Sequence, residues 1–217
     1  MPMNGIFIHQ QAKALIGLGH QCHVILTHKW YPPMGLHRFH PYWREGFATK
    51  SDYISVVDGV PVHSVPVFAK MPDRIFREDP YQREAKAILK FLKGNSEIGD
   101  IDWIISHFWT ETSFVGKLVK DGLNVPLAAF CRGDDIHEWT KSSPILYSHV
   151  QSVYSHADIL LANSQKLAED AQELVQNLEK REIKVVYNGV DLNKFSPLPI
   201  QLKKKLRGDL GWDKTKI

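Results

Sequence analysis

The sequence predicts an α/β protein with a doubly wound parallel sheet. Short, continuous apolar runs alternate with helical patterns in the second half of the chain, which is typical of strands covered on both faces by helices. The chain has 217 residues, of which 43% are hydrophobic and 24% charged, and this composition excludes wholesale disorder. At roughly 150 residues per domain, the length fits one large domain, or one domain and part of another.

The first third of the chain is expected to hold a helix, a strand and a hairpin. Apolar residues recur at helical spacing up to Gly19, and the apolar run Cys22–Thr27 predicts a buried strand. The segment Trp30–Phe47 has no periodicity and predicts a long loop. Asp58 and Gly59 stand between two β-branched runs, Tyr53–Val57 and Val60–Val67, which is a strong hairpin signal. We therefore expect a β-hairpin inserted ahead of the regular part.

Helices and strands alternate from residue 81 onward. Gly122 is expected to end the second helix, and Ser164 to cap the fourth. The expected helices are Tyr81–Leu92, Ser113–Lys120, Pro144–Ser155 and a segment from Ser164 to Leu178. The expected strands are Ile101–Ser106, Val125–Phe130, Asp158–Ala162 and Ile183–Tyr187.

Both ends of the chain suggest a longer native protein. The first helix starts within a few residues of Met1, whereas a doubly wound sheet normally has a strand before that helix, at its centre. Omitting that strand would leave unpaired backbone groups and an apolar slot between two strands. At the other end, the segment Gly211–Ile217 stops where a new strand is expected to begin. Frayed termini are the alternative.

Charge and hydropathy narrow the function classes. The net charge of +3 is too small to indicate nucleic acid, and the longest apolar stretches fall far short of the roughly 20 residues of a membrane span. No secretory signal opens the chain, so we expect a soluble, cytoplasmic protein. The basic run Lys203–Lys205 with Arg207 indicates either a solvated helix face or attraction to anionic lipid at the inner face of a membrane.

Polar residues recur after the expected strands, where parallel sheets bind their ligands. His107 can act as a general base or donate a hydrogen bond to a hydroxyl, or it can simply cap its strand. Arg132 beside Asp134 and Asp135 can hold a polyol or an anion, or stabilise its own turn by ion pairing. Gly5 would let a phosphate approach the first helix, although one glycine is weak evidence.

Other candidates carry less weight. His37 and His40 have no third ligand at a telling position, so we interpret them as loop histidines rather than a metal pair. The aromatic residues of the long loop can stack on a sugar, face a membrane or simply pack. Cys22 and Cys131 are expected to be small core residues. No glycine-rich dinucleotide or P-loop motif occurs, which lowers the case for NAD or ATP.

Four ordered motifs resemble family 4 of the GT-B glycosyltransferases. The first helix and the strand after it match in their Leu…Gly-His…Val joint. The loop starting at Arg132 is similar to the family's His-Gly-x-Asp-Ile loop, with arginine in place of the histidine. The other matches are the Ala-Asp…Ser strand at Ala157–Ser164 and the Asn-Gly-Val-Asp…Phe-x-Pro signature over Asn188–Pro197.

The resemblance implies a Rossmann-like fold, the N-terminal half of a GT-B protein, with an acceptor-binding domain over 1–196 and a linker with the start of a donor domain over 197–217. It implies transfer of a sugar from a nucleotide-sugar donor to a hydroxyl, with retention, without an essential metal and without another cofactor. The acceptor would be a glycan or a lipid-linked molecule in polysaccharide or glycolipid synthesis. The first alternative is a non-catalytic module that binds carbohydrate or nucleotide on the same scaffold. A more distant one is a related GT-B sugar-nucleotide epimerase, which would need a different set of carboxylates.

The resemblance also assigns roles to single residues. It implies that the fragment alone is inactive, because the family's donor-binding residues lie in the other domain. The implied residues are His107 and Arg132 as catalytic, Trp109, Glu111 and Asp135 as acceptor-binding, Gly5 in the donor-diphosphate loop, and Asn188, Gly189 and Asp191 between the domains.

Overall fold

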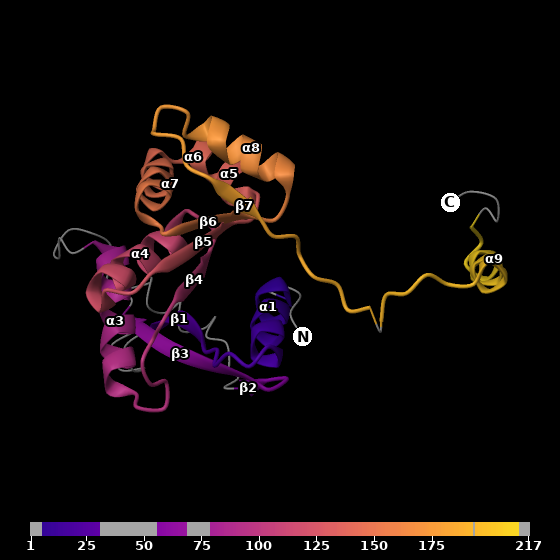
Figure 1. Cartoon of the computed structure of the whole chain (residues 1–217), viewed down its shortest axis with the longest axis horizontal. Helices are drawn as coiled ribbons and strands as arrows, with labels where there is room; N and C mark the ends of the chain where they lie inside the picture. Colours follow the sequence, from indigo (N-terminus) through magenta and orange to yellow (C-terminus); the bar gives the residue numbers. More distant parts are fainter. Residues whose placement is uncertain (1–5, 31–55, 69–78, 193, 213–217) are drawn as a thin grey trace, which may run out of the picture. The chain divides into compact units, whose positions relative to one another are not determined.

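A computed structural model describes residues 6–30, 56–68, 79–192 and 194–212 of the chain (Figure 1). It divides into two compact units, Met1–Tyr187 and Asn188–Ile217. The larger unit contains both sheets and the candidate site, and the smaller one contains helix α9, Ile200–Asp209. Most of the aromatic loop and both loop histidines lie outside the described residues, as does Gly5.

A small sheet with strand order β1-β3-β2 follows helix α1. Strands β1 and β3 pair in parallel, and the two-residue β2 pairs antiparallel with β3. The turn between β2 and β3 has positive φ at both Asp58 (48°) and Gly59 (81°), as a tight hairpin requires, which confirms the predicted hairpin. The bounds are Ile6–Gly17 for α1, Val24–Trp30 for β1, Val56–Val57 for β2 and Val60–Phe68 for β3.

The second sheet has strand order β4-β5-β6-β7, and every neighbouring pair is parallel. All residues of β5 are buried, as expected for a strand with partners on both edges and helices over the sheet. The predicted parallel α/β architecture is therefore confirmed. The bounds are Ile104–His107 for β4, Leu127–Cys131 for β5, Ile159–Ala162 for β6 and Ile183–Val185 for β7.

The strands form two sheets rather than one continuous sheet. Within the part of the chain that is described, β1 pairs with β3 and β4 pairs with β5, and no ladder joins β1 to β4. Helix α3 connects the two sheets, because it packs on β1 and β3 and also on α4. One hydrogen bond of this connection runs from Thr27 Oγ1 in β1 to Glu84 Oε1 in α3, at 2.6 Å.

The helices begin where side chains or prolines can stabilise the first turn. Ser164 Oγ accepts a hydrogen bond from Leu167 N at 3.2 Å, which confirms the predicted cap of α8. Ser143 caps α7 in the same way. The helices are α3 Pro80–Gly94, α4 Glu111–Leu123, α5 Asp134–His137, α6 Trp139–Ser142, α7 Pro144–His156 and α8 Gln165–Leu174, of which the short α5 and α6 were not predicted.

Gly122 does not end α4, contrary to the prediction. The helix continues to Leu123 and ends at Asn124, whose φ of 57° is left-handed. A Cβ at Gly122 would lie 2.6 Å from Leu89 Cδ1, so the glycine lets α3 pack closely on α4. Tertiary packing, which the local pattern does not reveal, is the reason for glycine at this position.

The main core lies between the second sheet and helices α7 and α8. Trp109, Leu127 and Tyr154 are among its largest fully buried side chains, and Cys131 belongs to it. In Figure 1, helices α3, α4 and α7 lie on one side of the strands and α1 on the other. The carboxyl ends of β4 and β5 are therefore bordered by α1 and by the loops that lead into α4 and α5.

The smaller unit presents an amphipathic helix. Leu202 and Leu206 of α9 are exposed at helical spacing, as is Leu210 just after the helix, and the basic run Lys203–Lys205 lies on the same helix. Among the described residues, no helix is both long and apolar enough to cross a membrane.

Candidate functional site

His107 and Arg132 meet at the carboxyl ends of two adjacent strands. His107 is the last residue of β4 and pairs with Phe130 of β5, and Arg132 follows β5 directly. The parallel register therefore brings together two residues that are 25 positions apart in the sequence. The structure thus brings these two predicted residues together at the strand ends, and their catalytic roles stay a prediction.

The guanidinium of Arg132 donates hydrogen bonds to the ring of His107. Its Nη2 lies 2.7 Å and its Nε 3.2 Å from His107 Nδ1. Because Nδ1 accepts from a permanent donor, the proton of the neutral ring is assigned to Nε2. His107 can therefore donate from Nε2 to a ligand oxygen while Arg132 fixes its orientation.

Two aromatic rings and an amide surround the same guanidinium. The carbon Cζ of Arg132 lies 4.5 Å from the ring centre of Phe7 and 4.2 Å from that of Phe130. Gln11 Oε1 accepts from Arg132 Nη2 at 3.2 Å. Cations attract ring faces within about 6 Å, so these rings hold the charge in place without neutralising it.

The surroundings keep His107 neutral. Burial, and then the positive charge of Arg132, lower the pKa of His107 to about 3. A ring with this pKa is a poor general base near neutral pH, where a base works best with a pKa close to the ambient value. Of the two chemical roles predicted for His107, the lowered pKa therefore favours hydrogen-bond donation over general-base catalysis.

Arg132 remains a cation. Burial lowers its pKa to about 10, with a smaller opposing effect from Asp135, so the guanidinium is still charged at neutral pH. A half-buried charge acts through a lower effective dielectric constant than an exposed one, and its attraction for an anion is stronger. Arg132 is therefore suited to bind a phosphate, a carboxylate or developing negative charge.

Asp135 holds the backbone beside both residues. Its Oδ2 accepts from Trp109 N at 2.7 Å, and its Oδ1 accepts from Arg132 N and from Gly133 N, each at 2.9 Å. The side chain is fully buried. Burial outweighs these hydrogen bonds and raises the pKa of Asp135 above its usual value.

The other predicted acceptor-binding residues lie in different environments. Trp109 is fully buried, and its indole Nε1 donates to Ala129 O at 2.9 Å. Glu111 is exposed in the first turn of α4 and accepts from the hydroxyl of Tyr81 at 3.0 Å. Of these residues and Asp135, only Glu111 is exposed at the surface. The acceptor-binding role of all three stays a prediction.

The remaining predicted site residues lie outside the described residues or in the smaller unit. Gly5 lies outside the described residues. Asn188, Gly189 and Asp191 belong to the smaller unit, where the carbonyl of Asp191 accepts from Phe195 N at 2.9 Å. Their role between domains stays a prediction.

Sequence reasoning did not assign a role to Phe7 or Gln11. Both lie on α1, more than 120 residues before Arg132, and Gln11 contacts it across 121 positions. Nothing in the local sequence around Phe7 and Gln11 indicates that they contact Arg132. Only the docking of α1 beside the ends of β4 and β5 brings them to the site.

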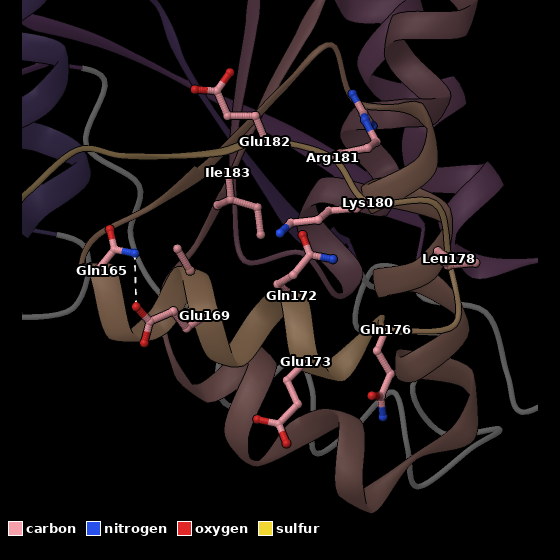
Figure 2. Close-up of a pocket in the computed structure, with 11 residues that line it drawn as sticks. Gln165, Glu169, Gln172, Glu173, Gln176, Leu178, Lys180, Arg181, Glu182 and Ile183 are labelled. Atoms are coloured by element: carbon pink, nitrogen blue, oxygen red, sulfur yellow. Dashed lines mark hydrogen bonds between the residues drawn. The ribbon is translucent and has the colours of Figure 1, made fainter.

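A shallow hollow lies along α8 and the segment before β7 (Figure 2). Its lining mixes acidic, basic and amide side chains, and Gln165 Nε2 donates to Glu169 Oε1 at 3.1 Å within it. Neither His107 nor Arg132 lines it. Among the described residues, no three His, Cys, Asp or Glu side chains are grouped as a metal site would require.

The fold is that of a Rossmann-like α/β domain, with the candidate site residues at the carboxyl ends of parallel strands. The family model described as Glycosyltransferase Family 4 matches residues 5–194. The chain therefore belongs to this glycosyltransferase family, and the resemblance drawn from the sequence motifs is confirmed.

Two similar proteins extend this comparison. The first is TuaC of Bacillus subtilis (strain 168), which has the provisional name of teichuronic acid biosynthesis glycosyltransferase. It is 25% identical over 153 residues, covering 70% of this chain and 37% of TuaC. The second is MnaA of S. aureus in a co-structure with UDP, at 14% identity and a TM-score of 0.37, covering 84% of this chain and 50% of MnaA. A likeness at that TM-score adds nothing to the assignment. The chain thus spans half or less of the length of each protein.

Proposed function

We propose that this chain is the acceptor-binding part of a retaining glycosyltransferase that moves a sugar from a nucleotide-sugar donor to a hydroxyl group. The observation that carries the proposal is the pair formed by His107 and Arg132 at the ends of β4 and β5, within a domain of this family. The name of TuaC supports a polysaccharide as the product.

The chemistry of the transfer fits the two side chains. The bond between the anomeric carbon and a phosphate oxygen of the donor breaks, and a bond to the acceptor oxygen forms. Negative charge then develops on the departing diphosphate, and a fixed cation lowers the energy of that state. Arg132 supplies such a cation, and His107 donates a hydrogen bond from Nε2 to a hydroxyl of the sugar.

Retention, the absence of an essential metal and the identity of the acceptor also belong to the proposal. They are implied by the family rather than by the contacts of this chain. Contact with a membrane surface through the basic run of α9 is a further part of the expectation, since a lipid-linked acceptor would be presented there.

The test uses the whole protein as its native host makes it. Release of nucleoside diphosphate is measured with a panel of nucleotide sugars, with and without cell-wall glycan acceptors. We expect Arg132→Ala and His107→Ala to lower the rate by about 100-fold or more, as removal of one such stabilising group does elsewhere. Lys120→Ala, at the amino end of the same sheet, is the control and should keep the rate.

The outcome separates the two function classes. If the protein binds nucleotide sugar or glycan but transfers no sugar to any acceptor, it is a binding module rather than an enzyme. If transfer occurs and neither variant changes its rate, the catalytic roles of His107 and Arg132 are wrong.

A further inference from the structure

The carboxylate of Asp135 connects the loops that follow two neighbouring strands. Oδ2 takes the backbone N–H of Trp109, two residues after β4, and Oδ1 takes those of Arg132 and Gly133, directly after β5. The side chain has no exposed surface, so it cannot itself touch a substrate in this arrangement. Its oxygens serve the backbone alone in these three contacts.

The connection begins where the sheet stops. The ladder between β4 and β5 ends at the pair of His107 and Phe130, and one further backbone hydrogen bond joins Phe108 N to Phe130 O at 2.8 Å. Beyond that point, the sheet no longer fixes the distance between the two chains. Next to His107 and Arg132, the hydrogen bonds of the Asp135 carboxylate connect the two chains instead.

The backbone on each side of the carboxylate has an uncommon conformation. Phe108 has a φ of 65°, which few residues other than glycine adopt, and Gly133 has a φ of 127°. Such conformations persist only where surrounding contacts determine them. The hydrogen bonds to Asp135 lie next to both positions and supply such contacts.

We propose that Asp135 is a positioning residue, whose buried carboxylate holds the two strand-end loops so that His107 and Arg132 face each other. The inference rests on the proposed function of those two side chains. It assigns to Asp135 a role in the rate of transfer without contact with donor or acceptor.

The chemistry of the contact suggests the variant. A carboxylate offers two acceptor oxygens, whereas an amide offers one oxygen and one NH₂ donor. In Asp135→Asn, the NH₂ must face either the N–H of Trp109 or those of Arg132 and Gly133, so one loop loses its tie. The variant keeps the size of the side chain and leaves His107 and Arg132 in the sequence.

The experiment compares four forms of the whole native protein: wild type, Asp135→Asn and two controls. Asp121→Asn makes the same chemical change at an exposed residue of α4, where Asp121 pairs locally with Lys117. Leu127→Ala removes a fully buried side chain at the other end of β5 and reports what lost stability alone does. Rates, KM values and denaturation midpoints are measured under conditions in which every form is more than nine-tenths folded.

We expect Asp135→Asn to lower kcat at least tenfold with a smaller change in KM for the donor, and both controls to keep kcat. An unchanged kcat in Asp135→Asn, or an equal loss in Leu127→Ala, would overturn the positioning role. If Asp135→Asn lowers kcat while Arg132→Ala and His107→Ala do not, the proposed function of those residues fails instead.

A second variant covers the case in which Asp135→Asn does not fold. A Cβ at Gly133 meets nothing within 4 Å, so Gly133→Ala disturbs the backbone at a φ of 127° without a clash. Under the proposal, this variant also lowers kcat while His107, Arg132 and Asp135 remain. A wild-type kcat in Gly133→Ala would contradict the need for fixed loops.

Discussion

One aspartate holds the backbone at each end of β5, and the two are used differently. At the carboxyl end, Asp135 is fully buried and binds three backbone N–H groups of two loops. At the amino end, Asp158 Oδ2 accepts from Leu127 N and from Lys120 Nζ, each at 2.7 Å. The side chain of Asp158 is 41% exposed.

The pKa values of the two carboxyl groups are shifted in opposite directions. Burial raises the pKa of Asp135 despite its three hydrogen bonds. At Asp158, burial is the largest single effect and raises the pKa, but the hydrogen bonds from Lys120 and Leu127 and the charge of Lys120 together outweigh it, so the pKa is lowered. The amino end of the strand thus carries a partly exposed contact, whereas the carboxyl end keeps a carboxyl group in the interior, where burial disfavours its charged form. The energetically unfavourable burial of a carboxyl group therefore occurs at the end of β5 where the candidate site lies.

The largest difference in stability between the two ends of the sheet should come from substitutions of the two tryptophans that flank β4. Trp109 at the carboxyl end is fully buried, and Trp103 at the amino end is 49% exposed. We expect Trp109→Ala to lower the free energy of unfolding by about 3–5 kcal/mol, because it leaves a cavity and removes the hydrogen bond from the indole to Ala129 O. Trp103→Ala should cost less than about 1 kcal/mol. Urea unfolding of both variants measures this, and equal losses would remove the contrast.

As the pH is lowered, the carboxyl end of the sheet should lose stability before the amino end does. The pKa of His107 is about 3 in the folded protein and roughly 6.5 when unfolded, so the unfolded state gains the proton first. His107 therefore imposes no penalty above pH 6.5, and stability falls as the pH drops from 6.5 toward 3. We expect a loss on the order of 3 kcal/mol between pH 7 and 4.5, at about 1.4 kcal/mol per pH unit.

The check on this pH dependence is His107→Gln, which cannot take up the proton. Unfolding curves at several pH values should show a shallower decline for the variant than for the wild type. Parallel curves for the two proteins would mean that His107 is not kept neutral by its site.

The smallest effect is expected at the amino end. The lowered pKa of Asp158 means that its contribution is fully present above the unfolded value of roughly 3.9 and is lost as the pH falls through the folded value. Because the side chain is partly exposed and screened, Asp158→Asn should cost no more than about 1 kcal/mol at pH 7. This cost should shrink below pH 4 and in high salt. A cost that persists at pH 3 would argue against an ionic contact.

The regular part of the fold was accessible from the sequence because its signals are local. Apolar runs gave the strands of the second sheet to within a few residues, Ser164 marked the start of α8, and Asp58 with Gly59 marked the hairpin. Gly122 led to a wrong helix end because glycine is needed there for a different reason: the side chain of Leu89, from another helix, packs against it.

The candidate site likewise has a part that local sequence signals predicted and a part that they did not. His107 and Arg132 were predicted because residues that follow parallel strands meet at one edge, whatever the rest of the fold does. Their mutual hydrogen bond and the neutral state of His107 depend on burial and register, which no local pattern contains.

The sequence by itself determined the α/β class, the order of most elements and the family, since these rest on periodicity, turn residues and ordered motifs. Only the tertiary structure decided that α1 brings Phe7 and Gln11 to Arg132, and that Asp135 spans two loops instead of facing solvent. The physical reason is that contacts between distant segments depend on how the helices and loops pack against the sheet. The burial that sets the charge of a group depends on the same packing.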